Sequence, residues 1–267
     1  MDSTTSSSIR RHDGKEVEIE LPLFWHDPPW SQVNSDRADI VASAVALSGV
    51  LVSVLRSDLA GVNRESIFFG GELPPDPSAA AQPQPPATSP DASVASTPHR
   101  IVPYRPERYG MDVRDFDGAK IIDVRLALPR DAAGRFAYSP AQLERWEATP
   151  ASQPLAGGSW VPAATFPPDV VSIRHLSQKF QQLRSLSPDA AVLATISPFR
   201  LTEELPAIAA ARPDGIILEV HEQSLSGLQL ADLTVRARTM IDQAGGDSIA
   251  LWIAPGEVTP DDAVKLI

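Results

Sequence analysis

The chain contains no cysteine. Disulfide bonds, a thiol nucleophile and an iron–sulfur cluster held by the chain's own thiolates are therefore excluded. This absence suits a reducing compartment, and we expect a cytoplasmic protein. Basic residues are also scarce, because 23 lysines and arginines stand against 34 aspartates and glutamates, a formal net charge of -11. Nucleic acid and anionic membrane surfaces repel such a charge, so neither is an expected partner.

Long apolar runs are missing as well. The best candidate, residues 39–55, is shorter than the ~20 apolar residues of a bilayer span and contains three serines. It predicts a buried helix rather than a membrane helix. Arg10 and Arg11 are followed by charged residues where a twin-arginine export signal needs an apolar core, which argues against export. The chain also lacks the G-x-G-x-x-G, Walker, G-x-S-x-G and H-E-x-x-H motifs.

Composition divides the chain into four regions. Residues 1–17 are rich in serine and threonine and predict a mobile N-terminal tail. Residues 18–73 form an N-terminal segment that holds the buried helix. Proline lacks a backbone donor and fixes φ, so residues 74–106, with their many prolines, predict a disordered insertion. That insertion is either a spacer or the docking segment of a partner-binding scaffold. Residues 107–267 form the main α/β portion.

Strand-like and helix-like segments alternate regularly from residue 120 onward. Short apolar runs predict strands, and apolar residues at helical spacing predict helices. The expected strands cover residues 120–128, 190–196, 215–220 and 248–254, and the expected helices cover 139–147, 173–186, 202–212 and 229–244. This order predicts a parallel sheet buried on both faces, either a (β/α) barrel or a doubly wound sheet.

A site in such a sheet lies at the carboxyl ends of the strands. Glu219 and Glu222 flank His221 at one strand end, which is acid–base geometry in outline or a solvated turn. A metal at His221 needs a third ligand that the sequence does not show. Arg200, after another strand, is either an anion-binding residue or a surface residue at a helix start. The other histidines have no visible partners: His12, His26, His99 and His175.

Four segments carry a resemblance to a known family. They are Ile122–Leu126 before a glycine-bearing turn at Pro129–Gly134, Leu183–Ser187, Asp214–Gly227 and Ala254–Asp262. In this order they resemble the I-E-I-K-L, L-R-x-L-S, D-F-I-x-V-D-G-x-E-G-G-T-G and A-S-G-K-x-x-T-P-x-D segments of the FMN-binding domain of glutamate synthase. The likeness runs from Ile121 onward.

The resemblance implies a (β/α)8 TIM-barrel-like fold and a flavin enzyme that forms glutamate from 2-oxoglutarate. It implies FMN as cofactor and assigns cofactor binding to Arg125, Glu219, Gly227 and Gly256. The chain ends before the family's last βα units, so we expect an incomplete barrel. Its uncovered edges predict self-association or a second chain that completes the barrel.

Several positions depart from the family pattern. The family's strand-end lysines correspond to Arg125, Ala194 and Glu257, and Gln223–Ser226 replace the G-G-T-G turn. A carboxylate at residue 257 repels a flavin phosphate. The leading interpretation is therefore a degenerate, non-catalytic or accessory relative with a decayed flavin site. The alternatives are a working FMN-dependent oxidoreductase and a scaffold that uses the Pro-rich segment.

Overall fold

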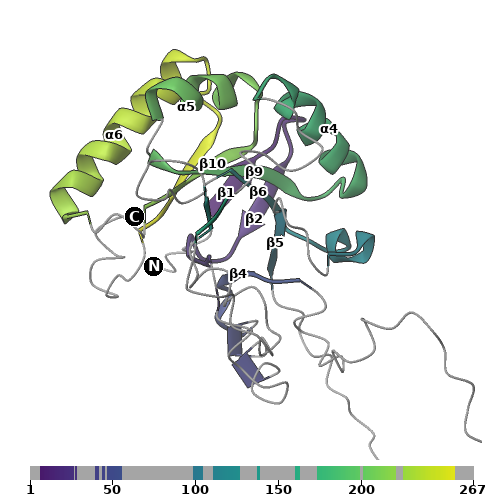
Figure 1. The fold of residues 1–267 in the computed structure, drawn as a ribbon. Helices are drawn as coiled ribbons and strands as arrows, with labels where there is room; N and C mark the ends of the chain where they lie inside the picture. The colour runs from purple at the N-terminus through teal and green to yellow at the C-terminus, as the bar shows by residue number, and fades with distance from the viewer. Residues whose placement is uncertain are drawn as a thin grey trace, which may run out of the picture.

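The computed structural model describes residues 7–26, 28, 40–41, 44–45, 47–55, 99–104, 111–126, 137–138, 160–162, 173–198, 201–220 and 225–255. Its centre is a seven-stranded sheet in the order β11-β10-β9-β6-β5-β4-β3, in which every neighbouring pair is parallel (Figure 1). The strands are β3 (Phe24–Trp25), β4 (Leu51–Ser53), β5 (Arg100–Tyr104), β6 (Ile121–Arg125), β9 (Ala191–Ile196), β10 (Gly215–Glu219) and β11 (Ala250–Ala254).

Neighbours in this sheet follow the order of the chain from β3 to β11. A doubly wound sheet reverses its strand order at a switch point, so that alternative is excluded. The sheet is curled, since Phe24 of β3 and Trp252 of β11, on its two edge strands, bring their rings to 4.9 Å between centroids. The fold is therefore a partial α/β barrel, as the alternation of segments predicted.

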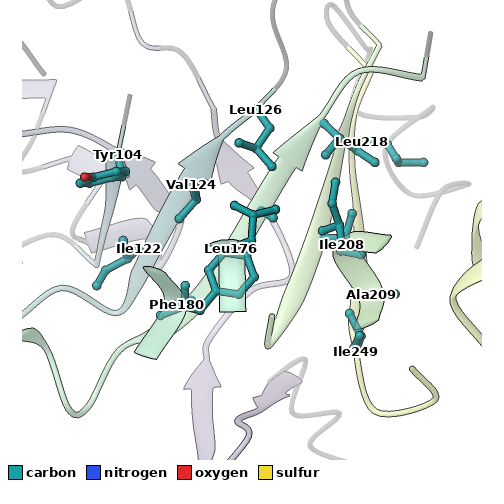
Figure 2. Packing of buried hydrophobic residues seen from close by; sticks show 14 of the residues in the cluster. Tyr104, Ile122, Val124, Leu126, Leu176, Phe180, Ile208, Ala209, Leu218 and Ile249 are labelled. Carbon is teal, nitrogen blue, oxygen red and sulfur yellow. The ribbon is translucent and has the colours of Figure 1, made fainter. Parts of the chain in front are cut away.

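Successive residues of each strand face opposite sides of the sheet, so the sheet contributes to two hydrophobic cores. Residues of all seven strands share the concave core with the N-terminal segment: Ile9, Val17, Ile19, Leu51, Ile101, Ile121, Ala191, Leu193, Ile217 and Ala254, with Phe24, Ala250 and Trp252 packed against them. The intervening residues face the helices on the convex side. There Leu176 and Phe180 pack in one cluster with Ile122 and Val124 (Figure 2).

The helices on the convex side are α4 (Leu176–Leu186), α5 (Leu201–Ala210) and α6 (Gly227–Gln243). A 3₁₀ turn at Ile173–His175 precedes α4, and another covers Val113–Phe116. These three helices and the last four strands lie within a few residues of their predicted bounds. The predicted helix at residues 139–147 lies outside the described residues, next to a short pair formed by β7 (Ala137–Tyr138) and β8 (Val161–Pro162).

The N-terminal tail prediction is wrong for residues 7–17. Strands β1 (Ser7–Arg10) and β2 (Glu16–Ile19) form an antiparallel hairpin, shown in purple against the sheet in Figure 1. Ile9, Val17 and Ile19 are at most 5% exposed, because they lie on one face of the hairpin and pack on the concave core. The prediction gave weight to the serines and threonines of this segment and overlooked its alternating buried and exposed positions.

The hairpin covers the amino ends of the strands. Its apolar face packs with Leu51, Ile121 and Ala191, each the first residue of its strand. The backbone N–H of His12 in the hairpin turn donates to Oδ1 of Asp214 over 2.8 Å. Asp214 is the residue directly before β10. Asp214 is buried and also accepts from Arg184 at 2.9 Å. The amino end of the concave interior is thus closed by the hairpin of β1 and β2.

The buried helix expected over residues 39–55 is wrong in two respects. Helical residues among 40–48 end at Gly49, whose φ of 69° favours glycine, and the chain then enters β4. Ile40 is 68% exposed and Leu47 is 84% exposed. Among the described residues of this helix, Val41 and Val45 pack against Val52 and Val54 of the β4 segment. Within the described part of the chain, no helix has the length and apolar content to cross a membrane.

The expected disordered insertion at residues 74–106 contains a central strand. All five residues of β5 are buried, including Pro103. The amides of Val52 and Val54 in the β4 segment donate to the carbonyls of His99 and Ile101, so the odd positions of β5 bond toward β4. Strand β4 ends at Ser53, and the donor that Pro103 lacks therefore falls at the end of that ladder. The remainder of the insertion lies outside the described residues.

Candidate functional site

Polar side chains replace apolar ones on the concave side toward the carboxyl ends of the strands. In β4, Ser53 follows Leu51 on this side; in β6, Asp123 and Arg125 follow Ile121. Thr195 stands at the same end of β9, in register with Arg125. These residues are 0–6% exposed, so they form a buried polar cluster. We call it the carboxyl-end cluster, and it also contains His26, which directly follows β3.

Asp123 is the centre of the carboxyl-end cluster. Its side chain is fully buried, and Nε of Arg125 donates to Oδ2 over 2.6 Å. The hydroxyl of Thr195 donates to Oδ1. Nε2 of His26 lies 3.5 Å from Oδ2, within ion-pair distance of the carboxylate. Side chains from β6, from β9 and from the residue after β3 therefore meet at this one carboxylate.

Arg125 ties the cluster to the first strands of the sheet. Its Nη2 donates to the backbone carbonyl of His26 at 2.9 Å and to Oγ of Ser53 at 3.0 Å. A guanidinium presents its donors in a rigid fork, so these bonds and the ion pair with Asp123 fix the side chain in one position. The cation predicted to bind a cofactor is engaged by the chain itself.

The environment of Asp123 favours its ionised form. Burial raises the pKa of a carboxyl, but the opposing charge of Arg125 and the interactions with His26 and Thr195 outweigh burial and leave the pKa of Asp123 below its ordinary value. The carboxyl-end cluster thus holds a carboxylate beside a guanidinium at neutral pH. The imidazole of His26 adjoins the pair.

The four predicted cofactor-binding residues have different outcomes. Arg125 belongs to the carboxyl-end cluster. Glu219 is the last residue of β10, partly buried, and shares the side of Gly215 and Ile217. Gly227 begins α6, and a Cβ there would meet no atom within 4 Å, so nothing at that position requires glycine. Gly256 lies outside the described residues, as do His221, Glu222, Arg200 and Glu257.

Ala194, which the resemblance places at a cofactor-binding lysine, does not face the concave interior. Ala194 is buried on the convex side among residues that face the helices. A side chain that reaches the concave interior from this part of β9 must stand at position 195, where the chain has threonine. The family's lysine and glycine pattern could not reveal this, because an offset of one residue moves a side chain to the other face.

Three of the histidines whose partners were not visible in the sequence have polar neighbours in the fold. His26 adjoins Asp123, the amide of His12 donates to Asp214, and Nε2 of His99 lies 3.8 Å from the Glu20 carboxylate. His175 is exposed at the start of α4.

Sequence reasoning missed four members of the carboxyl-end cluster: His26, Ser53, Asp123 and Thr195. One signal for Asp123 was present, since the alternation of Ile121, Asp123 and Arg125 places all three on one face. No comparable signal marks His26, because β3 has only two residues. Among the described residues, no group of three or more His, Asp or Glu side chains could hold a metal ion.

No family model matches the chain, and no curated protein gives a significant match. The fold and the cluster define a parallel α/β protein with a partial barrel, whose concave interior is apolar at the amino ends of the strands and charged at their carboxyl ends.

Proposed function

We propose that this chain is a glutamate-synthase-like (β/α)-barrel protein whose flavin site has decayed, and that it acts as a non-catalytic or accessory relative in flavin chemistry. One observation carries the proposal. The resemblance assigns the Arg125 cation to the cofactor, but its guanidinium donates hydrogen bonds to Asp123, His26 and Ser53 of the same chain.

The residues near Arg125 do not fit a phosphorylated flavin. A phosphate is held by cations or by backbone N–H groups of glycine-rich turns. The described carboxyl ends of β6 and β10 carry Asp123 and Glu219, and Gly227 opens an ordinary helix start with Ser226 as its cap. Carboxylates at this end repel a phosphate, which supports the loss of FMN binding.

The barrel interpretation belongs to the same proposal. A closed (β/α)8 barrel has one strand more than the seven in the described residues, and its first and last strands pair, which leaves no edge. The ring contact between Phe24 and Trp252 supports closure, since it joins the two edge strands across the concave core. The Pro-rich scaffold alternative concerns residues outside the described part, and no structural observation favours it.

Flavin binding tests the proposal directly. The purified protein is expected to be colourless, without the flavin absorption band at roughly 450 nm, and added FMN should keep its fluorescence. Riboflavin, which lacks the phosphate, serves as the matched ligand. Stoichiometric uptake of FMN would restore the rival interpretation, an FMN-dependent oxidoreductase that forms glutamate.

A matched variant shows whether the ion pair is the cause. In Asp123→Asn, the carboxylate that engages Arg125 is replaced by a neutral amide of nearly the same shape. If the ion pair prevents phosphate binding, this variant should bind FMN more tightly than the wild type does, while riboflavin binding should stay unchanged. Equal FMN binding by both proteins would place the loss elsewhere in the site.

A further inference from the structure

The helix before β4 carries apolar side chains on two of its faces. Val41 and Val45 pack against the β4 segment, whereas Ile40 and Leu47 are 68% and 84% exposed. Ala44 is exposed as well, and it lies between Ile40 and Leu47 on one side of the helix, because the three residues have the spacing i, i+4, i+7. We call these three residues the outer face.

The outer face differs from an ordinary solvated surface in its lack of charge. No Asp, Glu, Lys or Arg occurs from residue 40 to residue 55, in a chain in which 21% of the residues are charged. Helix α6 provides the contrast, since its exposed Leu228 and Val235 stand among charged residues such as Asp232 and Arg236. Single exposed apolar side chains among charges are normal, whereas a contiguous apolar face on an uncharged helix marks an interaction surface.

Charge and shape indicate which partner fits the outer face. A helix that lies on a membrane surface carries lysines and arginines on its polar side, and this helix has neither. Two chains with a net charge of -11 repel each other, and this repulsion is weakest where both are uncharged. The outer face is also symmetric, with the small Ala44 between two large side chains. A rotation by 180° therefore places Ile40 opposite Leu47 of a second copy and lets the helices approach closely at Ala44.

We propose that the outer face binds the outer face of a second copy, as two antiparallel helices related by a two-fold axis at Ala44. The same residues then contribute from both copies. Trp25 of β3 adds to the apolar surface beside the helix. It is in register with Val52, on the side of the sheet that the helix covers, and is 39% exposed. The interface thus includes the helix and the edge strand next to it, and it does not depend on flavin chemistry.

Sedimentation equilibrium of the full chain tests the proposal. The wild type should form a dimer, and Leu47→Asp should raise the dissociation constant at least about a hundredfold, because each dimer loses two buried leucines. Leu228→Asp changes an equally exposed leucine of α6, so it is the matched control and should keep the wild-type constant. A monomeric wild type, a dimer that Leu47→Asp leaves intact, or equal weakening by both variants would overturn the proposal. Binding to phosphatidylcholine vesicles that Leu47→Asp abolishes would assign the outer face to lipid and overturn it too.

A cross-link locates the two-fold axis. The chain has no cysteine, so Ala44→Cys introduces its only thiol. A disulfide requires Cα atoms within about 7 Å of each other, which the two copies of residue 44 satisfy only at the axis. Under mild oxidation, Ala44→Cys should form a linked dimer on a non-reducing gel at least about tenfold faster than Ala231→Cys, which changes an exposed alanine of α6. Equal rates of cross-linking would overturn the proposed pairing.

Discussion

The two ends of the concave interior are built from the same strands but differ in chemistry. At the amino ends, Leu51 and Ile121 pack against Ile9 and Ile19 of the N-terminal hairpin. Two residues farther along, Ser53 and Asp123 take their places on the same face. Residues two positions apart in a strand face the same side of the sheet. One such step therefore separates the apolar core from the polar cluster. Apolar packing at the amino end stabilises the fold. The charged cluster at the carboxyl end contributes less stability than apolar side chains would contribute there.

The largest expected effect comes from breaking the carboxyl-end cluster. Asp123→Ala leaves Arg125 buried without its carboxylate, and we expect a loss of about 3–5 kcal/mol in the free energy of unfolding. Urea denaturation followed by circular dichroism measures it. Asp232→Ala, which removes an exposed i,i+4 partner of Arg236, is the control and should cost at most about 1 kcal/mol.

A double variant shows whether the cluster serves stability. Asp123→Leu combined with Arg125→Met replaces both charges by apolar side chains, and the free energy of unfolding should return near the wild-type value or exceed it. If the double variant is as unstable as Asp123→Ala, the charged cluster is needed for stability. The carboxyl end would then stabilise the fold as the amino end does.

The amino end should respond to the loss of apolar contact. Ile19→Ala removes a side chain that is 1% exposed and packs on the concave core, so we expect a loss of about 2–5 kcal/mol. Thermal and urea denaturation check this value. Leu228→Ala, on an 83% exposed side chain of α6, should stay within about 0.5 kcal/mol. An effect of Ile19→Ala as small as that of Leu228→Ala would mean that the hairpin is not part of the core.

The sequence predicted the second half of the sheet well and the first half poorly. Strands β6, β9, β10 and β11 are apolar runs bounded by turns, so local pattern identifies them. Strand β5 contains Pro103, which argues against a central strand, and β3 is too short to have a period. Tertiary contacts, rather than local preference, determine both.

The candidate site was predictable only in part, for a related reason. Arg125 was found through the family pattern, but its partner Ser53 is 72 positions away and His26 is 99 positions away in the chain. Thr195 lies 72 positions from Asp123. Pairing of β6 with β9 brings Thr195 to Asp123, and curling of the sheet brings Ser53 and His26 to Arg125. No local pattern encodes these contacts.

Acid should affect the two ends unequally. The pKa of Asp123 is lower in the folded chain than the unfolded value of about 3.9, so its ionisation stabilises the fold above that value. That stabilisation is lost as the pH falls through the folded pKa. Urea midpoints measured from pH 7 to pH 3 should therefore fall more steeply in the wild type than in Asp123→Asn.

An exposed carboxyl provides the control for the acid experiment. The hydrogen bond and charge of Arg114 also lower the pKa of Asp112, but solvent screens that pair. Asp112→Asn should therefore leave the slope of the urea midpoint against pH close to that of the wild type. If Asp112→Asn flattens the slope as much as Asp123→Asn does, burial of the carboxyl-end cluster is not what sets the acid sensitivity.

The smallest effect is expected outside both ends, on the convex side. Ser226 caps α6: its Oγ accepts from the amide of Gln229, and the Gln229 side chain accepts from the amide of Ser226. Ser226→Ala should cost about 1 kcal/mol, measured by urea denaturation. Combined with Ile19→Ala, its cost should add to within about 0.5 kcal/mol, because the two residues belong to different packing layers. A larger coupling would mean that the hairpin and the outer helices stabilise the sheet as one unit, and the amino end could then no longer be treated separately from the layer that surrounds it.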